Sequence, residues 1–593
     1  MSSPTLQQLL QQGFEHHQAL RLGEAEKLYR QVLLVDPRNA EAHHFLGVVF
    51  QQLGRNAAAV DEITSAIAID SSQAEFYYNL GNSLLHLKHF DRAIDAFQSA
   101  ANLAPDLFEA VRNLGSAQML ADRADEAAQS FAAAAKLQPD AADVHNNLGM
   151  AQRALGQLDA ALESFRRAKT LQPTYRAAHD NYLYTLHFHP AYDASMIFRE
   201  HRDWAAAHAD PLARPDVQFG NVRTSDRRLR IGYVSPNFRE HPVGRALLPL
   251  IEQSDRDQFI TICYSDAAAN ANDLIYQRLR RRAGSWRDSA RWTDVQLIEQ
   301  IRQDAVDILV DTTLHMTGNR LSLFAQRAAP VQVTFIGYPA TTGLSQIDYR
   351  ITDPWLDPVG VSESVNSEEL IRLPRSFWCY DDASGSDEPV VGELSREGIT
   401  FGSLNNPAKI TEPVIEIWAK ILAAVPSSLL MLYATARANP GEPIRQKFQQ
   451  LGIDPARLLI VPRVPRQQYL RQYQQIDIAL DPWPYNGHTT TCDALWMGVP
   501  VVSLAGQTSV ARGGVSILSS IELTELLADS TDAYVAMATN LARDRDRLAT
   551  LRSSLRARMR KSPLMDAVGF TQDVERIYHQ LWWRWCEKNS RKP

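Results

Sequence analysis

Apolar residues follow two different rhythms along this chain. Up to about residue 186 they recur at the spacing of amphipathic helices, and small residues return at a fixed interval of 34 positions. The recurring small positions are Gly13, Gly47, Gly81, Gly115 and Gly149, and Ala25, Ala59, Ala93, Ala127 and Ala161. A constant period of this length predicts helical repeats that stack, because each unit buries its apolar face only against its neighbours.

Two further positions complete the repeat unit. A bulky residue and a closing proline recur in register with the small residues, at Tyr29, Ile63, Phe97, Phe131 and Phe165, and at Pro37, Pro105, Pro139 and Pro173, with Ser71 in place of one proline. This is the tetratricopeptide pattern. It predicts an α-solenoid of five repeats over residues 1–188, ending in a degenerate sixth helix from about Arg176 to Leu186.

One polar position recurs inside the array. Asparagine occupies the same place on the first helix of four successive units, at Asn79, Asn113, Asn147 and Asn181. An amide donates and accepts hydrogen bonds, so such a ladder could hold the backbone of an extended peptide in the groove of the solenoid. The alternative is that each amide bonds to the neighbouring repeat.

After a connector over residues 189–228, the pattern changes to alternating strands and helices. The expected strands are Leu229–Ser235, Phe259–Ser265, Val306–Thr312, Val331–Tyr338 and Tyr349–Thr352, then Ile399–Leu404, Leu429–Ala434, Leu458–Val461, Ile476–Leu480 and Val499–Leu504. Intervening helices are expected at Gly244–Gln253, Ala271–Ala283, Thr293–Gln303 and Asn319–Gln326. The pattern predicts two doubly wound α/β domains, 229–390 and 391–593, joined by a polar linker at Asp381–Arg396.

Composition narrows the function classes. The formal charge of −7 and the absence of charge runs argue against a nucleic-acid binder. No basic leader or long apolar stretch is present, which favours a cytoplasmic protein without a membrane span. The four cysteines are isolated, and the first sheet lacks GxGxxG, so zinc, redox and nicotinamide or flavin sites have no support.

The segment Asp481–Pro500 carries the strongest candidate chemistry. Asn486-Gly487 makes a turn between two apolar runs, and His488, Thr489 and Thr490 stand where the next helix begins. Such a helix start offers N–H groups and hydroxyls to an anion, and Asp493 one turn later could accept from a ribose hydroxyl. A plain helix cap by a threonine explains the same residues.

Taken together, the motifs resemble the O-GlcNAc transferase family of nucleotide-sugar glycosyltransferases. The resemblance rests on the repeats followed by SPNFREHPVG, GNRLSLFAQRAAPVQVTFIGYPATTG, FGSLNNPAKI, NGHTTTCDALWMGVPVV and a final SPL before an aromatic helix. It implies a GT-B catalytic region, a UDP-GlcNAc donor, inversion at the anomeric carbon, and transfer to Ser or Thr hydroxyls of proteins held along the repeats. The large insert of animal members is missing, as in bacterial members.

The resemblance also assigns roles to individual residues. It implies that His488, Thr489 and Thr490 hold the diphosphate, that Asp493 holds the ribose, and that Lys409 stabilises the departing phosphates. Asn406 and Arg466 stand where animal members have Gln and Lys, and Tyr469 stands where they have His against the base. These departures leave another donor open, GDP-fucose or UDP-glucose.

His241, after the first strand of the first sheet, matches a family histidine that has been proposed as the general base. It could instead only contact a substrate, or pack within its loop. The second family histidine aligns with Ser285, so that role is absent. We also expect, on weaker grounds, His315, Thr341 and Thr342 to lie in the sugar pocket. Arg512 could contact either a phosphate or an acidic neighbour.

No metal or cofactor is expected. Asp255-Arg-Asp257 and Asp544-Arg-Asp546 do not close strands, and Lys409 with a helix N-terminus already counters the diphosphate. The main expectation is therefore a metal-independent inverting transferase acting on protein acceptors. The rival from another class is a repeat scaffold that binds a nucleotide sugar with little turnover.

Overall fold

A computed structural model describes residues 5–214, 216–224, 226–381, 390–394, 398–433 and 441–590. Most of the expected linker Asp381–Arg396 lies outside the described residues, as does Ala434 at the end of one expected strand.

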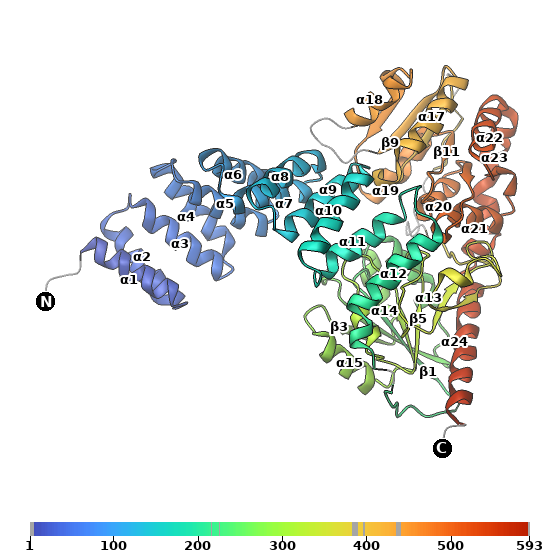
Figure 1. Cartoon of the computed structure of the whole chain (residues 1–593), viewed down its shortest axis with the longest axis horizontal. Helices are drawn as coiled ribbons and strands as arrows, with labels where there is room; N and C mark the ends of the chain where they lie inside the picture. The colour runs from blue at the N-terminus through green and yellow to red at the C-terminus, as the bar shows by residue number, and fades with distance from the viewer. Residues whose placement is uncertain are drawn as a thin grey trace. The chain divides into compact units, whose positions relative to one another are not determined.

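The N-terminal part is a series of helix pairs (Figure 1). Their bounds are α1 Leu6–Gln18, α2 Leu22–Val35, α3 Ala40–Gln52, α4 Asn56–Ile69, α5 Ala74–His86, α6 Phe90–Leu103, α7 Phe108–Leu120, α8 Ala124–Leu137, α9 Ala142–Ala154 and α10 Leu158–Leu171. Close packing explains the repeated glycines, since a Cβ added at Gly81 or Gly115 would lie 2.6 or 2.8 Å from the ring of Phe97 or Phe131. The small and bulky positions of the repeat are therefore partners across each helix pair.

The chain forms two compact units. One holds the repeats through Leu155 together with Glu163–Leu171, and the other holds Gly156–Leu162 and most of the chain after Gln172. The helices α11 (Arg176–Leu186) and α12 (Ala194–His208) belong to the second unit. From the sequence, α11 was expected to close the solenoid. The residues of α12 were expected to belong to an irregular connector.

The first sheet of the second unit has seven parallel strands in the order β3-β2-β1-β4-β5-β6-β7. Their bounds are β1 Leu229–Ser235, β2 Phe259–Ser265, β3 Ser285–Asp288, β4 Ile308–Asp311, β5 Val331–Thr334, β6 Tyr349–Thr352 and β7 Glu369–Arg372. The helices are α13 Pro242–Gln253, α14 Leu274–Arg282, α15 Asp294–Gln303 and α16 Leu321–Ala325. The sequence missed β3 and β7, which are short edge strands with polar residues.

The second sheet has six strands in the order β10-β9-β8-β11-β12-β13. They are β8 Thr400–Ser403, β9 Leu429–Tyr433, β10 Leu458–Val461, β11 Ile478–Leu480, β12 Val501–Leu504 and β13 Leu527–Ala528. The helices are α17 Glu412–Ala424, α18 Glu442–Gln450, α19 Arg466–Gln472, α20 Thr489–Trp496, α21 Gly513–Ser520, α22 Thr531–Arg543 and α23 Arg545–Arg560. Strand order reverses at β1/β4 in the first sheet and at β8/β11 in the second, and ligands of such sheets bind at the carboxyl ends beside these points.

The last helix, α24 (Ala567–Ser590), corrects one expectation about the domains. Sequence order placed it in the second α/β domain. Its apolar residues Phe570, Val574 and Trp582 belong instead to the core of the first sheet. The chain therefore returns to the first domain after completing the second.

The described helices were also compared with the dimensions of a bilayer. Among the residues that the structure describes, no helix has the length and apolar content that crossing a membrane demands.

Candidate functional site

Loops from the carboxyl ends of both sheets carry the candidate residues. His241 follows β1, Lys409 follows β8, and the segment from Asp481 to His488 follows β11. The parallel strands of each sheet present these ends along one edge. Within the second sheet, hydrogen bonds bring Lys409 and the start of α20 together, while His241 lies at the same kind of strand end in the first sheet.

The N-terminus of α20 forms the floor of the site. The first N–H groups of a helix, here those of Thr489 and Thr490, have no intrahelical acceptor and carry the positive end of the helix dipole. The Thr490 hydroxyl donates to Asn405 Oδ1 at 2.8 Å, while the Thr491 hydroxyl bonds back to the Gly487 carbonyl at 2.7 Å. An anion at this helix start would meet the free N–H groups and the side chains of Thr489 and Thr490.

Lys409, in the loop after β8, reaches the N-terminus of α20. Its ammonium donates to the Asn486 carbonyl at 2.6 Å and to Asn405 Oδ1 at 3.4 Å, and lies 4.3 Å from the centre of the Tyr485 ring. Lys409 and Thr490 thus converge on a single amide oxygen. Among the described residues no carboxylate lies within ion-pair distance of this ammonium, so its direct contacts are neutral oxygens and a ring face, while the Asp481 carboxylate favours its charged form from a longer distance.

The turn before α20 is built around a buried carboxylate. Asp481 accepts from the Gly487 N–H and from the Ser503 hydroxyl, both at 2.5 Å. A Cβ at Gly487 would lie 2.6 to 2.8 Å from Thr490, Thr491 and Asp481, so this tight turn requires glycine. Burial raises the pKa of Asp481 and lowers the pKa of Lys409. A bound diphosphate would restore the charged form of the lysine.

His488 supports the helix start through its ring. Its Nε2 lies 3.2 Å from the Val510 carbonyl, which can only accept, so the neutral ring carries its proton on Nε2. Burial and the nearby Lys409 charge lower the pKa of His488 to about 3. The ring packs 4.7 Å from Trp378, and a Cβ at Gly513 would strike it at 2.2 Å. The neutral ring leaves the backbone and threonines as the donors for an anion.

Asp493 has partners that the sequence did not anticipate. Both of its oxygens accept from Arg466 at 2.6 Å, and the Tyr380 hydroxyl donates to Oδ1 at 2.8 Å. Burial alone would raise the pKa of Asp493, but the charge and hydrogen bonds of Arg466 hold it below its usual value. The residues expected to contact ribose and base thus form one buried ion pair with each other.

The other two residues expected near the base differ from one another in exposure. Tyr469 is buried beneath Arg466, bonds to the Tyr473 hydroxyl at 2.9 Å and stacks on Tyr433 with ring centres 5.9 Å apart. Asn406 is exposed, and its side chain accepts from the Ala408 N–H at 3.0 Å, capping the turn that presents Lys409. Asn406 therefore positions the lysine through the backbone.

His241 caps α13 with its ring. Nδ1 accepts from the Val243 N–H at 3.2 Å, so the neutral imidazole bears its proton on Nε2. Burial, with the charges of Arg239, Arg245 and Arg463, lowers the pKa of His241 to about 4. In this arrangement the free nitrogen of His241 is a hydrogen-bond donor, which favours substrate contact over the role of general base.

The three residues weakly expected in the sugar pocket make hydrogen bonds within the protein. His315 is buried and uses both ring nitrogens, bonding to Asp180 and to the Thr342 carbonyl at 2.9 Å each. The hydroxyls of Thr341 and Thr342 both donate to Glu368. These contacts hold α11 and the loop after β5 in place.

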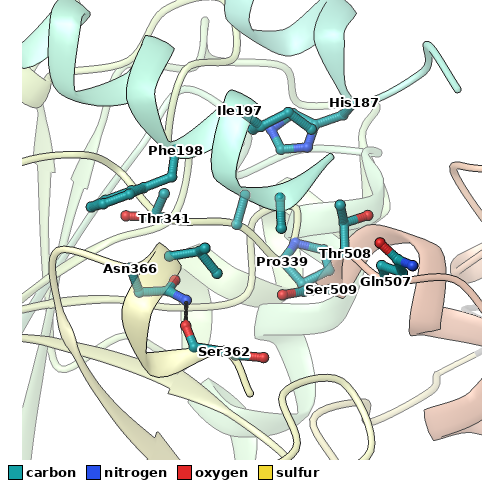
Figure 2. A pocket seen from close by; sticks show the side chains of 13 residues that line it. His187, Ile197, Phe198, Pro339, Thr341, Ser362, Asn366, Gln507, Thr508 and Ser509 are labelled. Atoms are coloured by element: carbon teal, nitrogen blue, oxygen red, sulfur yellow. Dashed lines mark hydrogen bonds between the residues drawn. The ribbon is translucent and has the colours of Figure 1, made fainter. Parts of the chain in front are cut away.

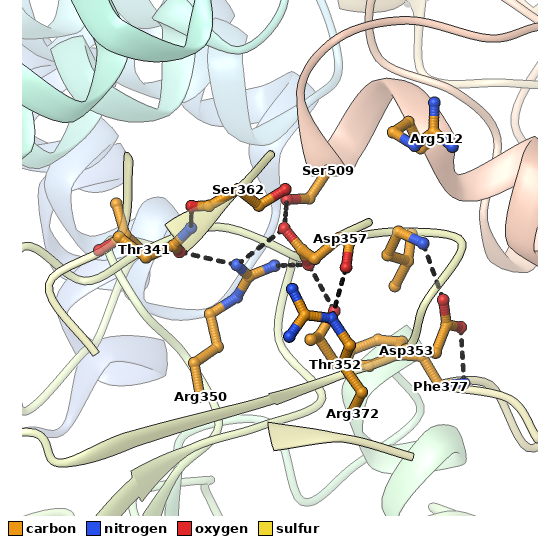
Figure 3. A network of polar contacts seen from close by, with 12 residues as sticks. Thr341, Arg350, Thr352, Asp353, Asp357, Ser362, Arg372, Phe377, Ser509 and Arg512 are labelled. Carbon is orange, nitrogen blue, oxygen red and sulfur yellow. Dashed lines mark hydrogen bonds and ion pairs between the residues drawn. The ribbon is translucent and has the colours of Figure 1, made fainter. Parts of the chain in front are cut away.

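At the far end of the crevice the charged groups are all used internally (Figure 3). Arg350 on β6 pairs with Asp357 at 2.7 Å, and both are buried, with side chains 3% and 0% exposed. Ser509 from the second sheet's domain donates to Asp357 at 2.7 Å, and Arg512 donates to the Trp355 carbonyl at 2.7 Å. Arg512 therefore ties the two α/β domains together, and Asp357 and Asp353 act on its charge as the acidic neighbours that one of the two expectations named.

Sequence reasoning missed this network. Its one visible signal is Arg350, a charged residue inside the otherwise apolar strand Tyr349–Thr352. A buried strand tolerates such a side chain only with a paired carboxylate, which here is Asp357, seven residues later.

The amides of the repeats were found half-buried. Asn79 Nδ2 lies 2.9 Å from His44 Nε2, Asn113 Nδ2 donates to Asn82 at 3.0 Å, and Asn147 accepts from Asn146 at 3.3 Å. Asn181 lies on α11, in the other compact unit. The bonds of Asn79 and Asn113 join neighbouring repeats, as expected if the amides stabilise the array. Each amide is nevertheless partly exposed.

Within the part of the chain that the structure describes, no group of three or more His, Cys, Asp or Glu side chains has the arrangement of a metal site.

Known protein families and solved structures resemble this chain in both its repeats and its α/β part. A model of glycosyl transferase family 41 matches residues 169–385 and 391–574, and tetratricopeptide-repeat models match residues 15–74, 74–107 and 142–175. A solved structure of an O-GlcNAc transferase variant from Thermobaculum terrenum covers 99% of this chain and 100% of its own, with 32% identity and a TM-score of 0.70. The likeness thus includes both the repeats and the two α/β domains.

Curated plant proteins show the same likeness over the catalytic part. A rice (Oryza sativa subsp. japonica) protein named probable UDP-N-acetylglucosamine--peptide N-acetylglucosaminyltransferase SPINDLY is 39% identical over 404 residues, which are 66% of this chain and 43% of that protein. The Arabidopsis thaliana protein named SEC, with the same stated activity, is 28% identical over 60% of this chain and 37% of its own length. The chain spans less than half the length of these relatives. Since the family model alone covers more than half of it, the chain belongs to glycosyl transferase family 41, with the repeat and GT-B architecture that its sequence predicted.

Proposed function

We propose that this chain transfers GlcNAc from UDP-GlcNAc to Ser or Thr hydroxyls of proteins, with inversion and without a metal ion. The observation that carries the proposal is the convergence of Lys409 and Thr490 on Asn405 Oδ1 at the N-terminus of α20. That amide oxygen stands where a phosphate oxygen would accept from the same donors. The names of the plant relatives give UDP-N-acetylglucosamine as the donor and a peptide as the acceptor, and the name of the Thermobaculum terrenum protein gives the same sugar.

The leaving group explains why these residues matter. Breaking the bond between the anomeric carbon and the diphosphate places a growing negative charge on UDP. A fixed ammonium and two helix N–H groups stabilise that charge most when the bond is nearly broken, which lowers the barrier instead of only tightening binding. The charge is countered by groups of the chain itself, so the mechanism that we propose uses no divalent cation.

The acceptor hydroxyl attacks the face of the sugar opposite the diphosphate, which gives inversion. His241 Nε2–H would donate to a substrate oxygen at the entrance of the crevice. Its proton position leaves the acceptance of the hydroxyl proton to another base, such as a phosphate oxygen or water.

A donor assay tests the proposal. Purified chain should release UDP from UDP-GlcNAc in the presence of an unfolded protein acceptor, and the rate should persist in EDTA. Loss of activity on chelation, with recovery on adding Mg²⁺ or Mn²⁺, would contradict the metal-free mechanism.

The ion pair of Arg466 and Asp493 is also compatible with a different sugar donor, GDP-fucose. Arg466 Nε is buried without a hydrogen-bond partner among the described residues, and guanine offers adjacent O6 and N7 acceptors that suit arginine. The same assay with GDP-fucose and UDP-glucose separates these candidates, and binding without release from any donor would identify a scaffold.

The repeat amides would hold the acceptor. Replacing Asn79, Asn113 and Asn147 together with Ala should weaken transfer to long protein acceptors and leave donor hydrolysis intact. An equal fall in both reactions would show that the amides serve the stability of the repeats.

A further inference from the structure

A second hollow lies away from the helix start, at the end of the crevice where the loops after β5 and β12 meet (Figure 2). It has a volume of about 40 Å³. Five segments line it: the residues after α11, the start of α12, the loop after β5, the loop after β12, and the segment before β7. Both α/β domains and the connector therefore contribute to its walls.

One wall of this hollow is the imidazole ring of His187, which is buried without a hydrogen-bond partner among the described residues. The residue is only 4% exposed, and neither ring nitrogen has a hydrogen-bond partner among the residues that the structure describes. Its ring meets the edges of His201 and Tyr338, with centres 5.5 and 5.2 Å away. A buried polar side chain without hydrogen-bond partners is unfavourable, so a ligand that bonds to it would gain affinity by satisfying it.

The hollow is electrically neutral. The nearest acids and bases are already paired with each other, Arg350 with Asp357, and Arg372 with Glu363 at 2.6 Å. Glu368 accepts from Thr341 and Thr342. Burial, with the charges of His315 and Arg350, lowers the pKa of His187 to about 3, which keeps its ring neutral. Among the described residues the carboxylates around the hollow are thus engaged by arginines or hydroxyls, which favours an uncharged ligand.

The remaining lining combines hydroxyl and amide groups with apolar faces. Phe198 and Pro339 form apolar walls, and the polar lining residues beside His187 are Thr341, Ser362, Asn366, Gln507, Thr508 and Ser509 (Figure 2). Neutral hydrogen-bonding groups beside carbon-rich surface suit a molecule with hydroxyls on a short carbon chain.

We propose that this hollow is a binding site for an uncharged polyol, either a short polyol or the hydroxymethyl end of a sugar, with His187 as its central hydrogen-bonding partner. A volume of about 40 Å³ accommodates roughly three water-sized groups, which matches two or three hydroxyl-bearing carbons and excludes a nucleotide. The site is separate from the donor diphosphate and does not depend on the proposed transfer reaction.

Histidine-selective ¹⁵N labelling of the full chain provides the test. The His187→Phe spectrum identifies the His187 resonances, which should move saturably as glycerol is added and, in a second arm, as glucose is added. The stronger of the two arms tells whether a short polyol or a sugar is the better occupant. Sodium acetate and tetramethylammonium chloride at matched ionic strength should move them little, because the described charged groups around the hollow are already engaged.

Two variants and a control sharpen the result. Ala194→Leu fills the hollow, and Thr508→Val removes one hydroxyl at nearly constant volume; each should weaken the response about tenfold or more. Ala191→Leu, exposed on the same connection and outside the hollow, should leave it unchanged. No saturable shift with either polyol, an equal shift in Ala194→Leu, or a larger shift with acetate would overturn the proposal.

Discussion

The two ends of the crevice use charged residues in opposite ways. At the α20 end, Lys409 is held by the Asn486 carbonyl and the Asn405 amide, and Asp481 acts on its charge only from beyond ion-pair distance. At the far end, Arg350 and Asp357 neutralise each other, and Ser509 and Arg512 extend the contacts into the second domain. The first end keeps a charge available for a ligand, while the second uses its charges to join the two domains.

The difference separates function from stability. A buried charge without a counter-ion costs free energy in the empty protein and is recovered when an anion binds. A buried ion pair that is complete within the protein offers nothing to a ligand, but breaking it leaves one charge stranded. Substitutions at the two ends should therefore produce opposite patterns of damage.

The largest expected effect is at the α20 end. Lys409→Ala should lower turnover about 10²- to 10³-fold, the loss typical of removing one preorganised donor to a developing anion. The free energy of unfolding should stay level or rise, because the variant removes a charge that burial disfavours. Lys420→Ala, an exposed lysine of α17, is the control for both measurements. Turnover within a few-fold of wild type would remove Lys409 from the mechanism.

At the far end, Asp357→Asn should act mainly on stability. It strands the Arg350 guanidinium, which is 3% exposed, and should lower the free energy of unfolding by about 3 kcal/mol in urea denaturation. Glu369→Gln breaks an arginine pair of equal length, 2.7 Å to Arg584, whose side chains are 36% and 56% exposed, and should cost under about 1 kcal/mol. Similar losses in both variants would show that burial of the far-end pair has no special weight.

The affinity for UDP should fall as pH rises. Burial lowers the pKa of Lys409, and UDP binds the protonated ammonium, so binding takes up a proton once the pH exceeds that pKa. Calorimetry should show a plateau at low pH and then a loss approaching tenfold per pH unit, beginning below the pH at which an exposed lysine titrates. Lys409→Arg, which stays charged, should flatten this dependence, and an unchanged slope in that variant would assign the proton to another group.

The smallest effect concerns His241. Its pKa is lowered to about 4, so the ring is neutral from pH 5 upwards and its charge should leave no limb near pH 6.5 in the pH profile of kcat/KM. His241→Gln, which keeps an N–H donor, should retain more activity than His241→Ala. A limb near pH 6.5 that disappears in His241→Gln would restore the general-base role.

Local sequence patterns were sufficient for most of the fold. The 34-residue period predicted the helix pairs, and the apolar runs predicted β1, β2, β6 and β10 with the bounds that the structure shows. The edge strands β3 and β7 were missed because their exposed polar residues hide the apolar pattern. The return of α24 to the first sheet depends on tertiary packing that sequence order does not reveal.

The site was predictable only where its chemistry is local. The helix start at Thr489 and the loop lysine at 409 follow directly from short motifs. The pairing of Arg466 with Asp493, 27 residues apart, and the contact of Ser509 with Asp357, 152 residues apart, arise from the meeting of separate loops. The tautomers of His241 and His488 likewise depend on backbone groups that the sequence does not specify.

The central claim is tested most directly by transfer of labelled sugar to a protein acceptor. Wild-type chain and Lys409→Ala would be incubated with UDP-GlcNAc, an unfolded acceptor protein and EDTA, and the acceptor examined by intact-mass spectrometry. The account predicts addition of N-acetylhexosamine on Ser or Thr by the wild type and its near absence with Lys409→Ala. Equal modification by both proteins, or none by wild type with any of UDP-GlcNAc, UDP-glucose and GDP-fucose, would contradict it.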